Sequence, residues 1–147
     1  MELAKFVAAR LDEDEQVAKR AGMKRRDDET WTYSADAGSE VRAASLGVTG
    51  RIVPVFGDHI ARHDPARVLA EVDAKRRILA SYTSALAQKD LLRSQMRQVI
   101  DTDHDEFARL HKQETELFEM GRKLRPVVAA LALPYAGHPD YDEAWRP

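Results

Sequence analysis

Apolar residues recur every three or four positions from residue 1 to residue 21, and charged residues occupy the opposite side. This spacing predicts an amphipathic helix over residues 1–21. Gly22 comes directly after the pattern and is typical of a helix stop.

Residues 30–56 follow a different pattern, in which β-branched and aromatic residues are separated by turn-forming Gly, Ser and Asp. The pattern predicts either an antiparallel β-hairpin or a three-stranded sheet. We expect two or three short strands, at residues 30–35, 40–45 and 50–55. Pro54 indicates that the last strand lies at an edge or ends there. Because a lone hairpin is marginally stable in water, we expect it to pack on a helix, anchored by Trp31 and Phe56.

Residues 64–132 return to helical spacing. Asp64 and the proline after it are typical of a helix start, because the carboxylate caps backbone N–H groups and proline fits the first turn. The middle of this stretch lacks Gly and Pro, so one long helix and a helical hairpin both stay open. The polar residues 101–106 favour a break, after which Thr102 or Asp103 would cap a second helix.

Residues 133–147 form a proline-containing tail with three aromatic residues, Tyr135, Tyr141 and Trp145. We expect these aromatic residues to dock the tail on the protein, near residues 59–69.

The length of 147 residues suits one domain, residues 1–147. A composition of 44% hydrophobic and 33% charged residues suits a folded chain with long solvated helices. The predicted fold class is therefore α+β and mostly helical. Its parts are an N-terminal helix, a small antiparallel β-hairpin or three-stranded sheet, a long helical hairpin, and a docked irregular tail.

The formal net charge is -2, so the overall charge does not point to nucleic acid or to an acidic membrane. The chain has no cysteine, which excludes disulfides, thiolate catalysis and cysteine-bound zinc. The sequence contains no apolar run of the length of a signal peptide or a membrane span. We therefore expect a cytoplasmic protein that does not contact a membrane.

His59, His63 and Asp64 are the candidate metal ligands. The two histidines are four residues apart, so on a helix they share one side, as metal-binding pairs do. The alternative is that Asp64 caps the next helix and the histidines form local hydrogen bonds. The metalloprotease signature has Glu where this chain has Ile60, so that class does not fit. No cofactor is predicted.

A basic run near the end of the first helix is the candidate nucleic-acid contact. Its members are Lys19, Arg20, Lys24, Arg25 and Arg26. Such runs can bind phosphates, but the acidic residues 27–29 follow directly and offset the charge. The sequence contains neither a nucleophile with a recognisable base nor a glycine-rich phosphate motif, so no catalytic residue is predicted.

Two longer motifs carry a family resemblance. They are HIARHDPARVLAEVDAKRRIL, at residues 59–79, and LALPYAGHPDYDEAWRP, at residues 131–147. The chain resembles a domain-of-unknown-function family of short proteins from actinobacteria and their phages. The resemblance implies no activity, so no catalytic or binding residue follows from it.

These observations favour a non-catalytic interaction or assembly protein, associated with a phage or mobile element. Long helices with an exposed apolar stripe favour coiled-coil self-association, and a homodimer is the first expectation. A second hypothesis is a nucleic-acid-binding or regulatory protein. A third is a metal-dependent enzyme that uses His59 and His63.

Overall fold

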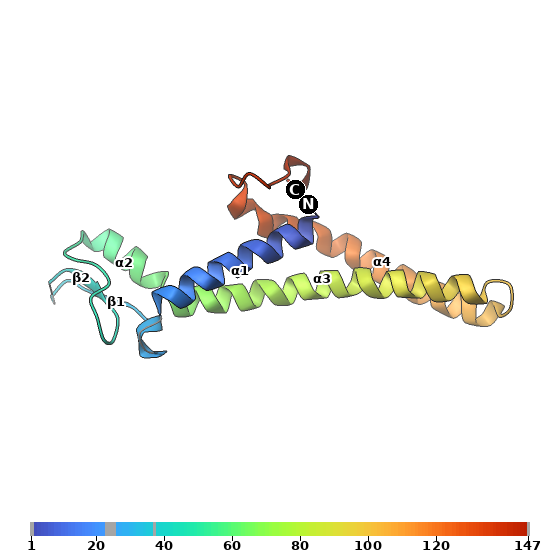
Figure 1. Cartoon of the computed structure of the whole chain (residues 1–147), viewed down its shortest axis with the longest axis horizontal. Coiled ribbons are helices and arrows are strands. Elements are labelled where there is room, and N and C mark those ends of the chain that lie inside the picture. The colour runs from blue at the N-terminus through green and yellow to red at the C-terminus, as the bar shows by residue number, and fades with distance from the viewer. Residues whose placement is uncertain (1, 23–25, 37, 147) are drawn as a thin grey trace. The chain divides into compact units, whose positions relative to one another are not determined.

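The computed structural model describes residues 2–22, 26–36 and 38–146, and within them the predicted mostly helical α+β fold is confirmed (Figure 1). The α-helices are α1 (Leu3–Ala21), α2 (Pro54–Arg62), α3 (Pro65–Val99) and α4 (His104–Ala132). The strands are β1 (Thr32–Ser34) and β2 (Glu40–Arg42). Three short 3-10 helices are η1 (Arg26–Glu29), η2 (Leu133–Tyr135) and η3 (Glu143–Trp145).

The chain divides into two compact units. The sheet unit comprises residues 10–74, and the hairpin unit comprises residues 1–9 and 75–147. Helices α1 and α3 each contribute residues to both units. The single domain expected over residues 1–147 stays a prediction.

In the sheet unit, β1 and β2 pair antiparallel, with Tyr33 opposite Val41. Gly38, at φ 95°, and Ser39, at φ 57°, adopt the left-handed backbone that the connection between the strands requires. Helix α2 covers β1, and a Cβ at Gly57 would overlap the ring of Tyr33. The expected packing of the β-hairpin on a helix is therefore confirmed, and the missing side chain of Gly57 is what permits it.

The third strand predicted at residues 50–55 is wrong. Residues 50–53 form no strand, and Pro54 opens α2. The fixed φ of proline suits the first turn of a helix, where the missing N–H would have no partner in any case. Phe56 is also wrong as an anchor, because it is 60% exposed. Trp31 is half-buried, and its indole N–H donates to the carbonyl of Asp28 at 3.0 Å.

Asp28 is the most deeply buried acidic side chain of the sheet unit, with 1% of its surface exposed. Its Oδ1 accepts from the backbone N–H of Ser45 at 2.7 Å, and its Oδ2 accepts from the Ser45 hydroxyl at 2.5 Å. Because a buried carboxylate is costly unless hydrogen-bonded, this pairing is what allows η1 to close on the loop that follows β2.

In the hairpin unit, α3 and α4 form a helical hairpin, which decides between the two arrangements that the sequence left open (Figure 1). Asp103 caps α4, since its Oδ1 accepts from the backbone N–H of Glu106 at 2.9 Å. Helix α4 continues through Pro126 to its end. Across the hairpin, Arg93 Nε donates to the buried carboxylate of Glu114 at 2.6 Å.

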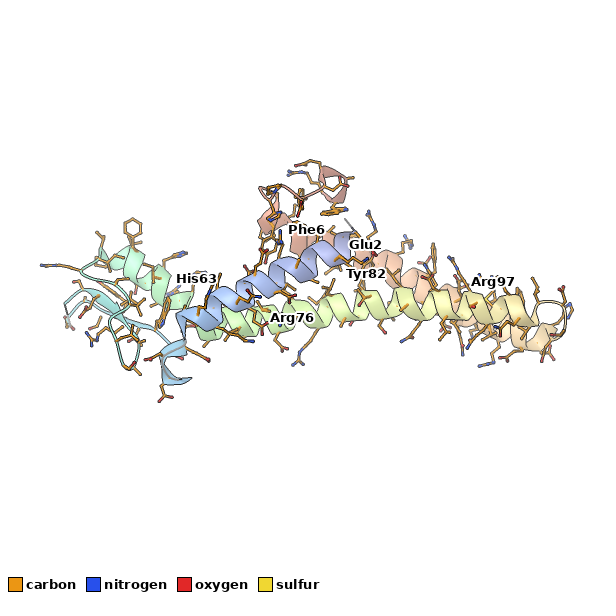
Figure 2. All side chains as sticks on the ribbon, in the orientation of Figure 1. Glu2, Phe6, His63, Arg76, Tyr82 and Arg97 are labelled. Carbon is orange, nitrogen blue, oxygen red and sulfur yellow. The ribbon has the colours of Figure 1, made fainter. Side chains whose placement is uncertain are left out.

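The C-terminal tail packs around Phe6 of α1, a side chain that is fully buried (Figure 2). Its ring centroid lies 5.0–6.4 Å from those of four tail residues, Tyr135, His138, Tyr141 and Trp145. Most of these ring pairs meet edge to face, an arrangement that aromatic side chains favour. The docked tail is confirmed, but its aromatic partner is Phe6 instead of the predicted residues 59–69.

Candidate functional site

One side of α3 in the hairpin unit is uncharged over about five helical turns. Its members are Ser81, Ser84, Gln88, Leu91, Gln95 and Gln98. Their spacing alternates between three and four residues, so they lie along one side of the helix. All six are exposed, and Leu91 keeps 59% of its surface open to solvent. In a chain that is 33% charged, such a stripe is an unusual surface.

Helix α4 carries a matching stripe of apolar residues with the same alternation. Its members are Leu117, Met120, Leu124, Val127 and Leu131. Each is partly or largely exposed, and Met120 is 49% exposed. A helix that faced only solvent would gain nothing from this apolar row.

A groove runs between the two stripes, and we call it the hairpin groove. One part of it has a volume of about 510 Å³ and is lined by Gln88, Leu91, Leu92 and Gln95 of α3 and by Gln113, Glu116, Leu117 and Met120 of α4. An adjoining hollow of about 700 Å³ is lined by Ser81, Thr115, Glu116, Glu119, Met120, Lys123 and Leu124. The groove therefore has an apolar floor and three glutamines on its rim, and its charged lining residues are Glu116, Glu119 and Lys123.

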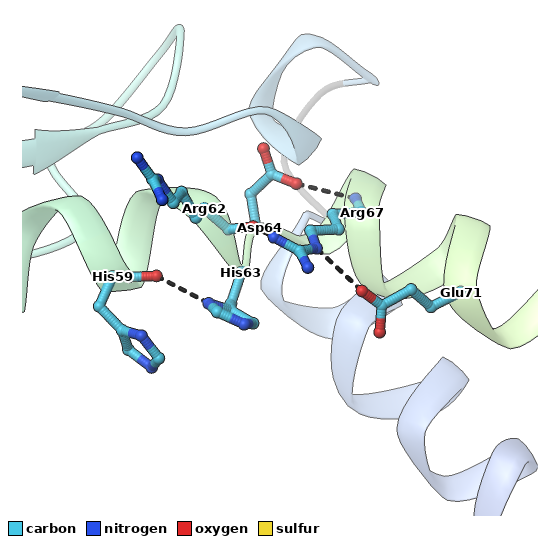
Figure 3. Close-up of polar contacts among 6 residues, drawn as sticks. All are labelled: His59, Arg62, His63, Asp64, Arg67 and Glu71. Atoms are coloured by element: carbon cyan, nitrogen blue, oxygen red, sulfur yellow. Dashed lines mark hydrogen bonds and ion pairs between the residues drawn. The ribbon is translucent and has the colours of Figure 1, made fainter. Parts of the chain in front are cut away.

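The predicted metal residues lie at the junction of α2 and α3 in the sheet unit (Figure 3). The rings of His59 and His63 lie 4.4 Å apart, measured between centroids, and His63 Nδ1 is 2.9 Å from the carbonyl of His59. Asp64 is buried and caps α3, because its Oδ1 accepts from the backbone N–H of Arg67 at 2.8 Å. Its Oδ2 accepts from the backbone N–H of Trp31 at 3.2 Å.

Both carboxylate oxygens of Asp64 thus accept hydrogen bonds from backbone N–H groups, as we expect for a residue that caps a helix. Within residues 2–22, 26–36 and 38–146, no three His, Asp or Glu side chains are grouped so that they would hold a metal ion. The metal site at His59, His63 and Asp64 stays a prediction.

The predicted nucleic-acid residues are only partly within the described chain. Lys19 and Arg20 are exposed in the last turn of α1, where positive charge complements the helix dipole. Lys19 Nζ lies 2.7 Å from a carboxylate oxygen of Glu15. Lys24, Arg25 and the side chain of Arg26 lie outside the described residues.

Charge is divided along the helical hairpin. We call residues 90–119 the tip and residues 75–89 and 120–138 the root. The tip carries eight carboxylates against four Lys and Arg, whereas the root carries seven Lys and Arg and no carboxylate. Hydrogen bonds from Arg109, in the tip, and from Arg122, in the root, hold the pKa of Glu106 and of Glu119, respectively, below the ordinary value.

The comparison with known families decides what the chain is related to. The sequence model of a family of unknown function, DUF6221, matches residues 1–147. The chain belongs to the DUF6221 family. The predicted resemblance to a domain family of unknown function is confirmed. Neither a curated protein nor a solved structure matches this DUF6221 chain.

The two motifs of this DUF6221 member now have positions in the structure. The first, residues 59–79, runs from the end of α2 through the Asp64 cap into α3. The second, residues 131–147, holds the aromatic tail that surrounds Phe6. Neither motif contributes a residue to the lining of the hairpin groove, although Leu131 of the second motif ends the α4 stripe. The part of the chain that the structure describes contains no helix of the length and apolarity needed to cross a membrane.

Proposed function

We propose that this DUF6221 protein is a non-catalytic interaction and assembly protein that binds helices of a partner molecule in the hairpin groove. The observation that carries the proposal is the exposure of Leu91 and Met120 in a groove rimmed by glutamines. Contiguous exposed apolar surface with a polar rim is typical of protein interaction sites.

The spacing of the two stripes supports a helical partner. Alternation of three and four residues is the pattern by which helices pack side by side in coiled coils and helix bundles. A groove with one such stripe on each wall presents two neighbouring helices, as half of a four-helix bundle does. The partner expected from the sequence is a second copy of the chain.

Substitution of the two exposed apolar side chains tests this function. The double variant Leu91→Gln and Met120→Gln keeps helix-compatible residues but removes the apolar floor. Burial of one such side chain contributes about 1.5–3 kcal/mol, so we expect the variant to self-associate at least tenfold more weakly in sedimentation equilibrium.

Phe118→Gln is the matched control for this experiment. Phe118 lies on α4, as Met120 does, and is 47% exposed, but it lines a different hollow, with Tyr82 and Arg125. We expect the control to associate like the unchanged chain. Equal weakening in both variants, or association that survives the double substitution, would contradict the proposed role of the groove.

A second candidate function is nucleic-acid binding, favoured by the seven Lys and Arg of the root. Fluorescence anisotropy with a labelled DNA duplex at low salt tests it. Binding that is lost on reversing Lys123 and Arg125 would support this candidate, as would loss on reversing Lys24, Arg25 and Arg26. Absence of binding at low salt would eliminate it.

We further propose a cytoplasmic location. We also propose an association with a phage or mobile element, because the two motifs resemble proteins of actinobacteria and their phages. Inspection of neighbouring genes tests the association. Adjacent phage structural or mobility genes would support it, and a consistent setting among metabolic genes would contradict it.

A further inference from the structure

We infer that the hairpin groove is filled by a second copy of this chain in antiparallel orientation, with the acidic tip of each hairpin over the basic root of the other. The inference rests on the proposed function, because it assigns an occupant and an orientation to the same groove. It is carried by the composition of the rim and by the charge division along the hairpin.

The rim suits an identical partner. Three of its four polar side chains are the glutamines Gln88, Gln95 and Gln113, and the fourth is Glu116. A two-fold axis brings equivalent or nearby residues of the two copies together. Like charges would repel there, whereas an amide both donates and accepts hydrogen bonds and can pair with another amide. The three glutamines therefore tolerate self-pairing.

The charges select the orientation. In a parallel pair, the eight carboxylates of one tip would lie alongside the eight of the other, and like charges repel. In an antiparallel pair, each tip lies over residues 81–89 and 120–125 of the partner's root, which carry Lys89, Arg122, Lys123 and Arg125 and no carboxylate. The tail adds three carboxylates near Phe6, at Asp140, Asp142 and Glu143, and one of these pairs with Arg146 at 2.9 Å. The root and tail together stay positive.

The position of the groove fits this overlap. With 1.5 Å of rise per residue, Ser81 lies about 15 Å from Leu91 toward the root, and Val99, the last residue of α3, lies about 12 Å from Leu91 toward the tip. Thr102 follows in the loop, where its N–H donates to the Val99 carbonyl. A two-fold axis at Leu91 therefore brings the loop with Thr102, Asp101 and Asp103 of one copy toward Ser81 of the other.

The absence of cysteine from the chain makes this geometry directly measurable. We would prepare Ser81→Cys and Thr102→Cys chains with different tags, exchange their subunits, and oxidise the mixture at low salt. Both positions are exposed. The inference predicts that the mixed disulfide, which joins a Ser81→Cys chain to a Thr102→Cys chain, forms at least fivefold faster than either homodimeric disulfide. It also predicts that 0.5 M NaCl weakens the dimer at least fivefold.

The outcomes separate this inference from the proposed function. A dimer that cross-links fastest through two Thr102→Cys chains is parallel, which overturns the inference and leaves the proposed function standing. A chain that stays monomeric and binds a helical peptide in the groove would also overturn the inference alone. A monomer that binds only a DNA duplex, through its root, would overturn both.

Discussion

The backbone N–H of Trp31 donates to Oδ2 of Asp64, while Oδ1 of the same carboxylate accepts from the N–H of Arg67. One buried side chain thus starts α3 and fixes the segment that enters β1, 33 residues earlier. Asp64, which lies in the first of the two motifs, therefore determines tertiary structure as well as a helix end.

Asp64→Ala should therefore be costly. It removes an N-cap, typically worth about 1 kcal/mol, and leaves the N–H of Trp31 without its carboxylate, at about 1–3 kcal/mol more. Asp103→Ala is the matched control, because its carboxylate caps α4 in an exposed loop. We expect urea unfolding followed by circular dichroism to show about 2–4 kcal/mol lost for Asp64→Ala and about 1 kcal/mol for Asp103→Ala. Equal losses would contradict the link to Trp31.

Gly57→Ala should destabilise the sheet unit, because the added methyl group overlaps the ring of Tyr33. Overpacking of this kind typically costs about 1–3 kcal/mol, despite the better helix propensity of alanine. Gly50→Ala is the control, since a Cβ there meets no atom within 4 Å. Thermal unfolding should separate the two variants, and an unchanged melting temperature for Gly57→Ala would show that α2 does not need this close contact.

Asp28 allows a test of buried polar pairing. Asp28→Ala leaves the N–H and hydroxyl of Ser45 without their acceptors, and we expect a loss of about 2–4 kcal/mol. Asp28→Asn keeps an acceptor for the N–H and offers a donor to the hydroxyl, so its loss should be smaller. Urea unfolding that ranks Asn below Ala in stability would contradict the assigned hydrogen bonds.

Three Glu–Arg pairs on the helices predict a mild dependence of stability on pH. Hydrogen bonds from Arg109, Arg122 and Arg146 hold the pKa of Glu106, Glu119 and Glu143 below the ordinary value in the folded chain. Their contribution is present above the unfolded-state pKa of about 4.3 and is lost as pH falls through the lower folded-state pKa.

The melting temperature measured from pH 6 to pH 3 tests this dependence. We expect a variant with all three glutamates changed to Gln to lose less stability than the unchanged chain over that fall. A slope identical to that of the unchanged chain would show that these exposed pairs contribute nothing.

Local signals in the sequence were sufficient for much of the fold. The Asp64 cap, the break before α4 and the docking of the aromatic tail each depend on residue types whose geometry is restricted. The prediction of a third strand was wrong because Pro54 is compatible with both a strand end and a helix start. Only the close contact between Gly57 and Tyr33, which are far apart in sequence, favours the helix. The partner of the tail could not be predicted, because Phe6 lies more than a hundred residues from it in sequence.

The hairpin groove was missed for a different reason. On α3, the apolar stripe that faces α4 includes Tyr82 and Leu92, and the uncharged stripe lies one residue before it, at Ser81 and Leu91. When only apolar residues are counted, the two neighbouring stripes cannot be told apart. The sequence signal of the uncharged stripe is the absence of charge at positions spaced by three and four residues.

Sedimentation equilibrium of the unchanged full chain tests the central claim most directly. The chain has a mass of 16.6 kDa. The account predicts that the apparent mass rises from this value to twice it with increasing concentration, with a weaker transition at high salt. A mass that stays at 16.6 kDa up to high micromolar concentration would contradict assembly through the hairpin groove.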